Sequence, residues 1–596
     1  MIDLETLLRV PCVESEMGFD LSPDGTRVAF SWNPEGQWDV YELLLESASQ
    51  PKKVSSGAGG KFHPQYSPDG RYLAYAVDLD GSENFHIVIQ ELFSGQVRNL
   101  TPEMSCAHQT FFDWAPDSRQ IAFISDQSGQ FNVFVGSIET GIARMVLDTG
   151  YPVWKVRWSP DGSLLAVTVE ACGIDYGTFI VSPRGELAEQ IRIGHEPIDA
   201  GQAAWSPNGK TLAFTSDTAG YNNIGLYDIA SQRVSWLTDG DGEKQFPCWA
   251  PDGKRLAYVF NRGTVSWLAI QRPGEPPILS RKEMGVHYCP EFTPDGNKLL
   301  YLFDNPGRPT DIWSLSINDL THAQLTNSMP AEMRSTELIM PEEITYPGMD
   351  GTPVPALLFN PAGQKPLPTI LIIHGGPDWL FEMTWYPLMA HLASRGWVVL
   401  APNYRGSTGY GRSWQAASRY DFGGVDTDDV AAGALFLIKQ GLADPQRIGI
   451  TGRSHGGYLT TSCMTRYPEL WAVGSAVVPF LNWFTNHAEI RPDLQHWDIE
   501  NFGDPVENHD LWYERSPSFF LDRLTAPLQL ICGGTDVRCP ISDSIQARDA
   551  LQSMGKVVDF VMYEDEGHIF LNIENVLDAE KRRTAFLAKY IDTKEQ

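Results

Sequence analysis

The stretch Arg447-Ile-Gly-Ile-Thr-Gly-Arg-Ser-His-Gly-Gly-Tyr458 decides the fold of the C-terminal part of this chain. Residues 448–451 are short and mostly apolar, which is typical of a buried strand. The pentapeptide Gly452–Gly456 then fits Gly-x-Ser-x-Gly, in which a serine sits on a sharp strand-to-helix turn. Glycine is needed on both sides of Ser454 because the turn leaves no room for side chains. The pattern therefore predicts a nucleophilic hydroxyl held clear of a sheet, beside the N-terminal amides of a helix.

Strands and helices alternate on both sides of this turn. After residue 333 we expect a hairpin over 344–347 and 354–359, strands at 369–374, 397–401, 447–451, 473–478, 528–532 and 557–562, and helices at 428–440, 456–466, 542–554 and 576–590. Such alternation predicts a doubly wound, mostly parallel sheet, here the α/β-hydrolase fold, with catalytic loops at the carboxyl ends of the strands.

The N-terminal part repeats one turn seven times. The turns are Ser22-Pro-Asp-Gly25, Ser67-Pro-Asp-Gly70, Ala115-Pro-Asp-Ser118, Ser159-Pro-Asp-Gly162, Ser206-Pro-Asn-Gly209, Ala250-Pro-Asp-Gly253 and Thr293-Pro-Asp-Gly296, spaced 43 to 48 residues apart. This is the period of a four-stranded propeller blade. Proline presets the turn, Asp or Asn caps it, and glycine takes the positive φ. We predict a seven-bladed β-propeller, with the aromatic residue before each turn packed between neighbouring blades.

Bulk properties indicate a multidomain globular protein. The 596 residues are 42% hydrophobic and 20% charged, and we expect a helix within 1–14, a propeller over 15–332 and a hydrolase domain over 333–596. The net charge of −30 makes nucleic acid and anionic membrane poor partners. With no basic, apolar leader and no long apolar run, we expect a soluble cytoplasmic protein. The eight cysteines lack metal-ligand spacing and are expected as reduced thiols, with Cys532 and Cys539 as packing residues.

Two later residues complete a candidate catalytic triad with Ser454. Asp536 follows the apolar run 528–532, where the acid of this fold belongs, and His568 follows the next strand near the end of the chain. The alternatives are a helix cap for Asp536 and a surface-loop histidine for His568. Asp565 and Glu566 are poorer acids because they leave the same loop as the base.

The oxyanion of a tetrahedral intermediate needs two donors. One is expected from the backbone N–H of His455, directly after the serine, and the other from the loop His374-Gly-Gly-Pro377. The side chain of His455 is expected to pack, while that of His374 either donates to substrate or holds its loop. This chemistry requires neither a metal nor a cofactor.

Together these motifs resemble the prolyl oligopeptidase family of serine peptidases, and most of all its acylaminoacyl peptidases. The motifs that carry the resemblance are His374-Gly-Gly-Pro, Asn403-Tyr-Arg-Gly-Ser-Thr-Gly-Tyr-Gly411, Gly452-Arg-Ser-His-Gly-Gly-Tyr458, Asp536-Val-Arg-Cys-Pro540 and Glu566-Gly-His568. The resemblance implies a triad of Ser454, Asp536 and His568 and oxyanion amides on Gly376 and His455. It also implies that Arg538 binds a substrate carbonyl and that the N-terminal helix packs on the hydrolase domain.

The resemblance also bears on specificity. The position of His374 is tyrosine in prolyl oligopeptidases and dipeptidyl peptidases, so histidine favours the acylaminoacyl branch. Dipeptidyl peptidases hold the substrate amine with paired propeller glutamates, whereas the only Glu-Glu here is Glu342-Glu343, outside the blades. By resemblance Trp483 and Phe484 wall an apolar pocket for the residue before the scissile bond, although core packing explains them equally well.

The leading hypothesis is a peptidase that releases N-acylated or apolar N-terminal residues from short peptides, with the propeller limiting access. A carboxylesterase of the same fold, a dipeptidyl or prolyl-type peptidase and a non-catalytic propeller scaffold are the alternatives. The sequence leaves open whether the chain forms a homo-oligomer.

Overall fold

The computed structural model describes two compact units. The described residues are 1–16, 18–45, 50–102, 107–185, 191–193, 199–280 and 283–592. One unit comprises Met1–Val10, Asp80–Ser82 and Ala331–Gln596, and the other comprises Pro11–Leu79 and Glu83–Pro330.

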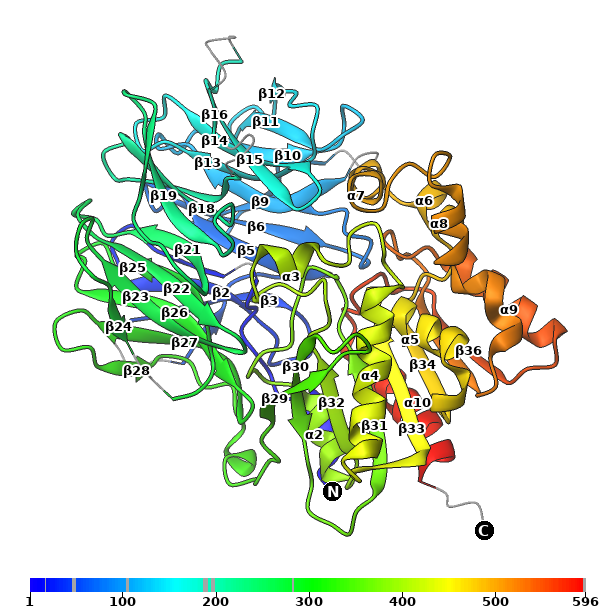
Figure 1. The fold of residues 1–596 in the computed structure, drawn as a ribbon. Helices are drawn as coiled ribbons and strands as arrows, with labels where there is room; N and C mark the ends of the chain where they lie inside the picture. Colours follow the sequence, from blue (N-terminus) through cyan, green and yellow to red (C-terminus); the bar gives the residue numbers. More distant parts are fainter. Residues whose placement is uncertain are drawn as a thin grey trace. The chain divides into compact units, whose positions relative to one another are not determined.

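The second unit is a β-propeller of seven blades, which confirms the expected fold (Figure 1). Each blade is an antiparallel sheet of four consecutive strands. The strands are β1 (Phe19–Leu21), β2 (Arg27–Trp32), β3 (Asp39–Leu44), β4 (Lys52–Lys53); β5 (Gly60–Tyr66), β6 (Tyr72–Asp78), β7 (His86–Glu91), β8 (Val97–Asn99); β9 (His108–Trp114), β10 (Gln120–Ser125), β11 (Asn132–Ser137), β12 (Ala143–Leu147); β13 (Val153–Trp158), β14 (Leu165–Cys172), β15 (Asp175–Val181), β16 (Ile191–Ile193); β17 (Gly201–Trp205), β18 (Thr211–Ser216), β19 (Asn223–Asp228), β20 (Arg233–Trp236); β21 (Glu243–Trp249), β22 (Leu256–Arg262), β23 (Val265–Gln271), β24 (Ile278–Ser280); and β25 (Val286–Phe292), β26 (Lys298–Asn305), β27 (Arg308–Ser316), β28 (His322–Gln324).

The seven repeated turns contact one another around the propeller. In six of them the glycine lies against the proline of the preceding turn, in the pairs Gly25–Pro294, Gly70–Pro23, Gly162–Pro116, Gly209–Pro160, Gly253–Pro207 and Gly296–Pro251. In the remaining turn Ser118 takes the positive φ of 59°, and its hydroxyl accepts the N–H of Asp69 from the preceding turn at 3.0 Å. The pair Gly25–Pro294 joins the first blade to the last, so the same contact that links neighbours also closes the ring.

Apolar packing closes the ring as well. In the described residues each blade keeps its own four strands, and side chains such as Phe30 of β2 and Leu302 of β26 share one buried cluster between the first and last blades. The backbone of Val13 also joins these blades, because it pairs with Trp32 of β2 and donates its N–H to the carbonyl of Thr310 in β27 at 3.0 Å. The aromatic residues before the turns also join blades. The indoles of Trp114, Trp205 and Trp249 each donate at 3.2 Å to a carbonyl of the preceding blade, which confirms their predicted place between blades.

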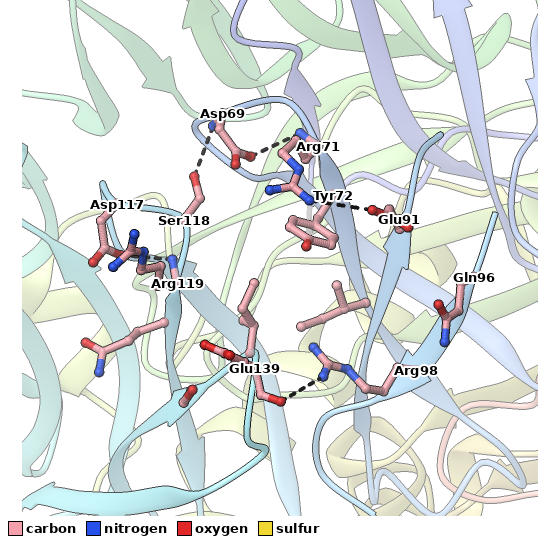
Figure 2. Close-up of a pocket in the computed structure, with 14 residues that line it drawn as sticks. Asp69, Arg71, Tyr72, Glu91, Gln96, Arg98, Asp117, Ser118, Arg119 and Glu139 are labelled. Carbon is pink, nitrogen blue, oxygen red and sulfur yellow. Dashed lines mark hydrogen bonds and ion pairs between the residues drawn. The ribbon is translucent and has the colours of Figure 1, made fainter. Parts of the chain in front are cut away.

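A polar crevice of about 1020 Å³ lies between the second and third blades (Figure 2). Its basic side chains face acidic or carbonyl oxygens, since Arg71 lies 3.6 Å from Glu91 and Arg98 donates to the carbonyl of Glu139 at 3.5 Å. Asp69 and Asp117 line the same crevice. With both signs of charge on its walls, the crevice selects neither anions nor cations.

The other unit is built on an eight-stranded sheet, which confirms the α/β-hydrolase fold. The strands, β29 (Glu342–Pro347), β30 (Pro353–Phe359), β31 (Leu367–Ile373), β32 (Val398–Pro402), β33 (Ala443–Arg453), β34 (Val473–Val477), β35 (Leu528–Gly533) and β36 (Val558–Tyr563), lie in the order β29-β30-β32-β31-β33-β34-β35-β36. The first two pairings, β29 with β30 and β30 with β32, are antiparallel, and all later ones are parallel. The carboxyl ends of β33, β35 and β36 therefore meet at one edge, where Ser454, Asp536 and His568 follow them.

The helices of this part of the chain are α2 (Pro387–Ser394), α3 (Arg412–Ala416), α4 (Val425–Lys439), α5 (His455–Arg466), α6 (Trp483–Glu489), α7 (Pro492–Phe502), α8 (His509–Glu514), α9 (Ile541–Ser553) and α10 (Ile573–Ile591), with 3-10 turns at Ala331–Met333, Pro468–Leu470 and Pro517–Arg523. Of these, α2, α4, α5, α9 and α10 pack on strands of the sheet. Helices α4 and α5 pack on each other and on β33 (Figure 1). None of the helices in the described part of the chain is long and apolar enough to cross a membrane.

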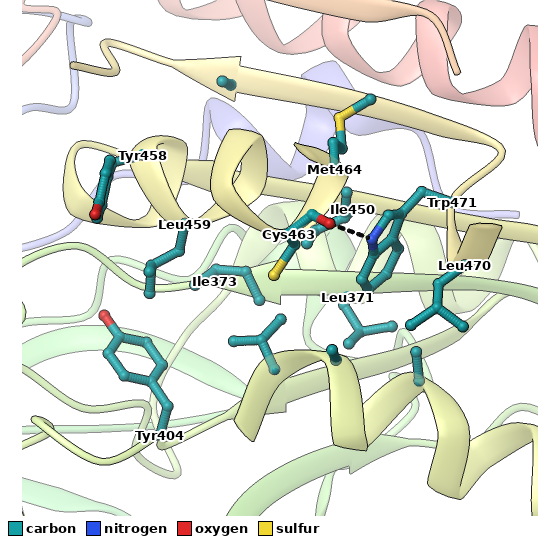
Figure 3. Packing of buried hydrophobic residues seen from close by; sticks show 14 of the residues in the cluster. Leu371, Ile373, Tyr404, Ile450, Tyr458, Leu459, Cys463, Met464, Leu470 and Trp471 are labelled. Atoms are coloured by element: carbon teal, nitrogen blue, oxygen red, sulfur yellow. Dashed lines mark hydrogen bonds between the residues drawn. The ribbon is translucent and has the colours of Figure 1, made fainter. Parts of the chain in front are cut away.

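The core of this unit lies between the sheet and α4 and α5. Leu371 and Ile373 of β31 and Ile450 of β33 face Leu459 and Cys463 of α5 (Figure 3). The indole of Trp471 donates to the carbonyl of Cys463 at 3.1 Å, so the one polar group of that large side chain is satisfied inside the core. Packing of this kind fixes the start of α5, and with it the turn at Ser454.

A short helix, α1 (Leu4–Leu8), belongs to the hydrolase unit. Asp3 caps it by accepting the N–H of Thr6, and Leu4 and Leu7 are buried. The helix packs on α2 and α10. The N–H of Ile2 donates to Ser394 at 2.9 Å, and Arg9 pairs with Glu574 at 2.9 Å.

We predict that the contacts between neighbouring turns stabilise the propeller, in addition to the stability that each turn gains from its own backbone conformation. Gly25→Ala and Gly141→Ala both force alanine into positive φ, 69° and 71°, which costs about 1–2 kcal/mol. Only at Gly25 does the new Cβ also meet a neighbouring turn, where it lies 3.0 Å from Cδ of Pro294. At Gly141 no such atom lies within 4 Å of the new Cβ. Calorimetry should therefore show a larger fall in the propeller's Tm for Gly25→Ala, and equal falls would contradict this role.

Candidate active site

Ser454 has the strained backbone that a nucleophile elbow requires. Its φ of 58° and ψ of −125° lie where residues other than glycine are rarely found. A Cβ on Gly452 would lie 2.3 Å from the carbonyl oxygen of Gly456, and one on Gly456 would lie 2.2 Å from the carbonyl oxygen of Ile373. Both contacts are with backbone, which cannot give way. The two flanking glycines are therefore required for the turn that presents Ser454.

Asp536 and His568 form a buried pair at the ends of their strands. Nδ1 of His568 lies 2.9 and 3.0 Å from the two carboxylate oxygens of Asp536, and both side chains are less than a tenth exposed. Burial alone would raise the pKa of Asp536. The charge and hydrogen bond of His568, with the N–H groups of Cys539 and Arg538, outweigh burial and hold that pKa below its usual value. Asp536 is therefore an anion placed to orient the imidazole.

The loops that carry this pair are tied together by groups that the sequence analysis did not single out for that role. The N–H of Thr535 donates to the carbonyl of Glu566 at 3.0 Å. The buried carboxylate of Glu566 accepts from the N–H of Leu571 at 2.7 Å and from Asn575 at 2.8 Å, which closes the loop around His568. Arg453, next to the serine, donates its guanidinium to the backbone carbonyl of His568. Arg453 and Glu566 are therefore positioning residues for the imidazole.

The hydroxyl of Ser454 meets a thiol in this structure. Burial, followed by the charge of Asp536, raises the pKa of Cys539 well above its usual value, and a hydrogen bond with Ser454 opposes that shift. A ring nitrogen of His568, the Cys539 sulfur and an Asp536 oxygen all lie within 4.8 Å of one another. Cys539 packs in the hydrophobic core, as expected, and it also lies beside the catalytic groups. The second role could not be predicted from the sequence because His568 lies on another loop.

The hydrogen bonds found for His568 run to Asp536, and among the described residues none joins its ring to Ser454. Catalytic hydrogen bonds are often long without substrate and shorten when substrate binds. In this structure the hydroxyl of Ser454 bonds to the thiol of Cys539 instead.

The expected oxyanion loop approaches the serine closely. A Cβ on Gly375 would lie 3.0 Å from the carbonyl oxygen of Arg453 and 3.2 Å from Cβ of Ser454, so a side chain there would crowd the serine. Gly376 follows with a φ of 115° and is exposed. His455 is the first residue of α5, where N–H groups have no partner one turn back in the helix. Gly376 and His455 thus belong to the two segments that border Ser454, the loop after β31 and the start of α5.

His374 holds its loop. Its Nδ1 lies 2.7 Å from the carbonyl oxygen of Gly375 and its Nε2 lies 2.8 Å from Oγ of Ser407, while its ring stacks on Tyr404 at 4.3 Å. Burial lowers the pKa of His374 to about 3, so the ring is neutral at working pH. Of the two roles left open by the sequence, these contacts favour support of the loop.

The imidazole of His455 packs among aromatic rings. Phe422, Tyr458 and Phe480 lie 5.2 to 6.1 Å away between ring centroids, and Nε2 lies 3.4 Å from a carboxylate oxygen of buried Asp426. The ring is 2% exposed. It is therefore a packing neighbour of the serine, as expected.

The three residues expected to bind substrate have different surroundings. Arg538 is exposed, and its backbone N–H donates to Asp536 at 2.8 Å. Trp483 is only 1% exposed, and its indole donates to the hydroxyl of Tyr458 at 3.2 Å, which fits the alternative reading of a core aromatic. Phe484 is half-buried and packs 5.5 Å from Trp512.

The cysteines in the described part of the chain are free thiols, and Cys106 lies outside it. Cys532 is buried on β35 in the hydrophobic core, as expected of a packing residue.

The propeller brings together an acidic pair that the sequence concealed. Asp20 of β1 and Glu291 of β25 line a cavity of about 520 Å³ bordered by the inner strands. Burial raises the pKa of Asp20 to about 7 against the N–H of Tyr66 and the charge of Arg157, and burial followed by the charge of Asp20 raises the pKa of Glu291 well above its usual value. The two residues lie on the first and last blades, far apart along the sequence, so a pattern of adjacent glutamates does not reveal them.

Comparison with known proteins identifies the family. Residues 384–594 match the model of the prolyl oligopeptidase family, and residues 12–193 match that of the TolB beta propeller domain. Dipeptidyl aminopeptidase BIII of Pseudoxanthomonas mexicana is 25% identical, covering 93% of this chain and 84% of that protein. Acylamino-acid-releasing enzyme 1 of Oryza sativa subsp. japonica is 28% identical, covering 79% of this chain and 56% of that enzyme.

Among solved structures, a puromycin-hydrolyzing peptidase of Mycobacterium tuberculosis aligns over 100% of this chain and 96% of its own with a TM-score of 0.87; at 18% identity this likeness shows the fold alone. Residues 384–594 therefore form a prolyl oligopeptidase family domain, and the peptidase relatives support a serine-type peptidase.

We predict that His374 acts by position and not by charge. His374→Gln should lower kcat about tenfold, less than the roughly 10²–10³ lost with an oxyanion donor itself, because the loop loses its support. The acid limb of the pH–rate profile should keep its midpoint, since a ring with a pKa of about 3 stays neutral across that limb. Tyr404→Phe removes the hydroxyl that donates to the carbonyl of His374 at 3.0 Å. This variant should also lower kcat and leave the midpoint of the acid limb unchanged. A shifted midpoint would contradict the assignment.

Proposed function

We propose that this peptidase cleaves short peptides through an acyl-enzyme on Ser454, with His568 as general base and then general acid. The close pair of Asp536 and His568, beside a serine on a strained turn, is the observation that carries the proposal. Asp536 stabilises the imidazolium that forms when His568 takes the serine proton. The backbone N–H groups of Gly376 and His455 stabilise the oxyanion.

We further propose that the substrate's amino terminus is acylated or its first residue apolar. The histidine at position 374, the likeness to acylaminoacyl peptidases and the acylamino-acid-releasing relative support this preference. Arg538 is the proposed donor to a substrate carbonyl, because it is exposed two residues from Asp536. The apolar pocket is assigned to the surroundings of Phe484 in preference to buried Trp483. Restriction to short peptides by the propeller, a cytoplasmic location and any homo-oligomer remain predictions.

Release of dipeptides with a free amino terminus is the second candidate. The acidic pair of Asp20 and Glu291 is the feature that supports it: an ammonium group bound at the two carboxyl groups would favour their ionised forms, although Lys155 and Arg157 line the same cavity. The relative named dipeptidyl aminopeptidase points the same way. The two candidates share the catalytic chemistry and differ in the charge at the substrate's amino terminus.

A matched set of chromogenic substrates tests both. N-acetyl-leucine p-nitroanilide, leucine p-nitroanilide, glycyl-leucine p-nitroanilide and p-nitrophenyl butyrate should be compared by kcat/KM. We expect the acetylated anilide to exceed the free-amine anilides by about tenfold, or about 1.4 kcal/mol of transition-state stabilisation. Higher rates on glycyl-leucine p-nitroanilide that fall in Asp20→Asn would favour dipeptide release. Turnover of the ester alone would overturn the peptidase specificity proposed here.

A further inference from the structure

We propose that Cys539, His568 and Asp536 form a binding site for a thiophilic divalent cation such as Zn²⁺ or Cd²⁺, which reversibly inhibits the enzyme. The proposal rests on the proposed function only in that the cation would occupy the catalytic pair. The ligand set itself stands on geometry.

Three different donor atoms converge here. The Cys539 sulfur, a His568 ring nitrogen and an Asp536 oxygen lie within 4.8 Å of one another, and all three residues are buried, at 5 to 8% exposure. Bonds of about 2.0–2.3 Å to a tetrahedral ion place its ligands about 3.3–3.8 Å apart, so side-chain shifts of about 1 Å complete the site. A water molecule or the hydroxyl of Ser454, which bonds to Cys539, would complete a four-ligand set.

The contacts that position the catalytic groups also hold the proposed metal ligands in place. Asp536 is fixed by the N–H groups of Arg538 and Cys539, at 2.8 and 2.9 Å. The His568 loop is fixed through its carbonyl by Arg453. Such outer contacts orient metal ligands as well as catalytic groups. A Ser-His-Asp set offers only oxygen and nitrogen, and the thiol of Cys539 adds the soft donor that favours Zn²⁺ or Cd²⁺ over Mg²⁺ or Ca²⁺.

Inhibition follows whichever ring nitrogen binds the ion. Coordination at Nε2 of His568 removes the lone pair that accepts the serine proton. Coordination at Nδ1 replaces the hydrogen bond to Asp536, and the proton that Nδ1 carried moves to Nε2, which can then no longer accept the serine proton. In either case a metal–sulfur bond forms as the sulfur–hydrogen bond breaks, and the thiol proton leaves to solvent.

Metal binding can be tested without turnover. In Ser454→Ala, titration with Cd²⁺ should produce the near-ultraviolet charge-transfer band of a cadmium–thiolate bond with one equivalent bound. The band should be lost in Ser454→Ala/Cys539→Ala and kept in Ser454→Ala/Cys532→Ala, which removes a buried thiol outside the donor group. Because Ser454→Ala is used, a band would appear even if the proposed peptidase specificity were wrong. A band that survives the loss of Cys539 would overturn the site.

Inhibition is the second test. Zn²⁺ should inhibit the wild-type enzyme and EDTA should restore its rate. The inhibition constant should rise at least about tenfold in Cys539→Ala, with each variant scored against its own metal-free rate, and stay unchanged in Cys532→Ala. Equal inhibition of Cys539→Ala and wild type would overturn the proposal, as would an absence of inhibition at metal concentrations that saturate the cadmium band.

Discussion

The strained turn at Ser454 is the constraint on which the rest of the hydrolase unit depends. A left-handed serine costs about 1–3 kcal/mol and persists only where its surroundings leave no alternative. Here the carbonyls of Ile373 and Gly456 approach the α-carbons of the two flanking glycines so closely that no side chain fits. Strand β33, helix α5 and the oxyanion loop all meet at that turn. Their packing holds Ser454 in its strained conformation.

The base and its acid are held by a different device. Their loops are joined by backbone hydrogen bonds and by two charged side chains, the buried Glu566 within the histidine loop and the partly buried Arg453 beside the serine. Removing a buried charge of this kind leaves its partners unsatisfied, which commonly costs more than the bond itself contributes. Arg453, the residue next to the nucleophile, thus links the turn at Ser454 to the position of His568.

Much of this architecture could be predicted from the sequence because it rests on local signals. The repeated turns gave the blade count, and the order of Ser454, Asp536 and His568 along strand ends gave the fold and the candidate triad. Helix and strand ends shifted by a few residues, as with β33, which begins at Ala443 and not at Arg447. Helices α6 to α8, between β34 and β35, were not anticipated.

What the sequence could not reveal are contacts between residues far apart along the chain. Asp20 and Glu291 meet because the first blade adjoins the last, and Cys539 meets His568 because two strand-end loops adjoin. Trp483 sits in a motif associated with a specificity pocket, yet a ring of aromatic neighbours encloses it. Adjacency in the fold, not residue type, decides each of these cases.

Covalent labelling by a fluorophosphonate, located by mass spectrometry of the tryptic peptides, tests the central claim most directly, because the reagent bonds only to a serine activated by its neighbours. The account predicts one adduct, on Ser454, which disappears in Ser454→Ala, slows at least about a hundredfold in His568→Ala, in line with the usual contribution of a general base, and persists in Ser462→Ala on the same helix. An adduct on another serine, or undiminished labelling in His568→Ala, would contradict it.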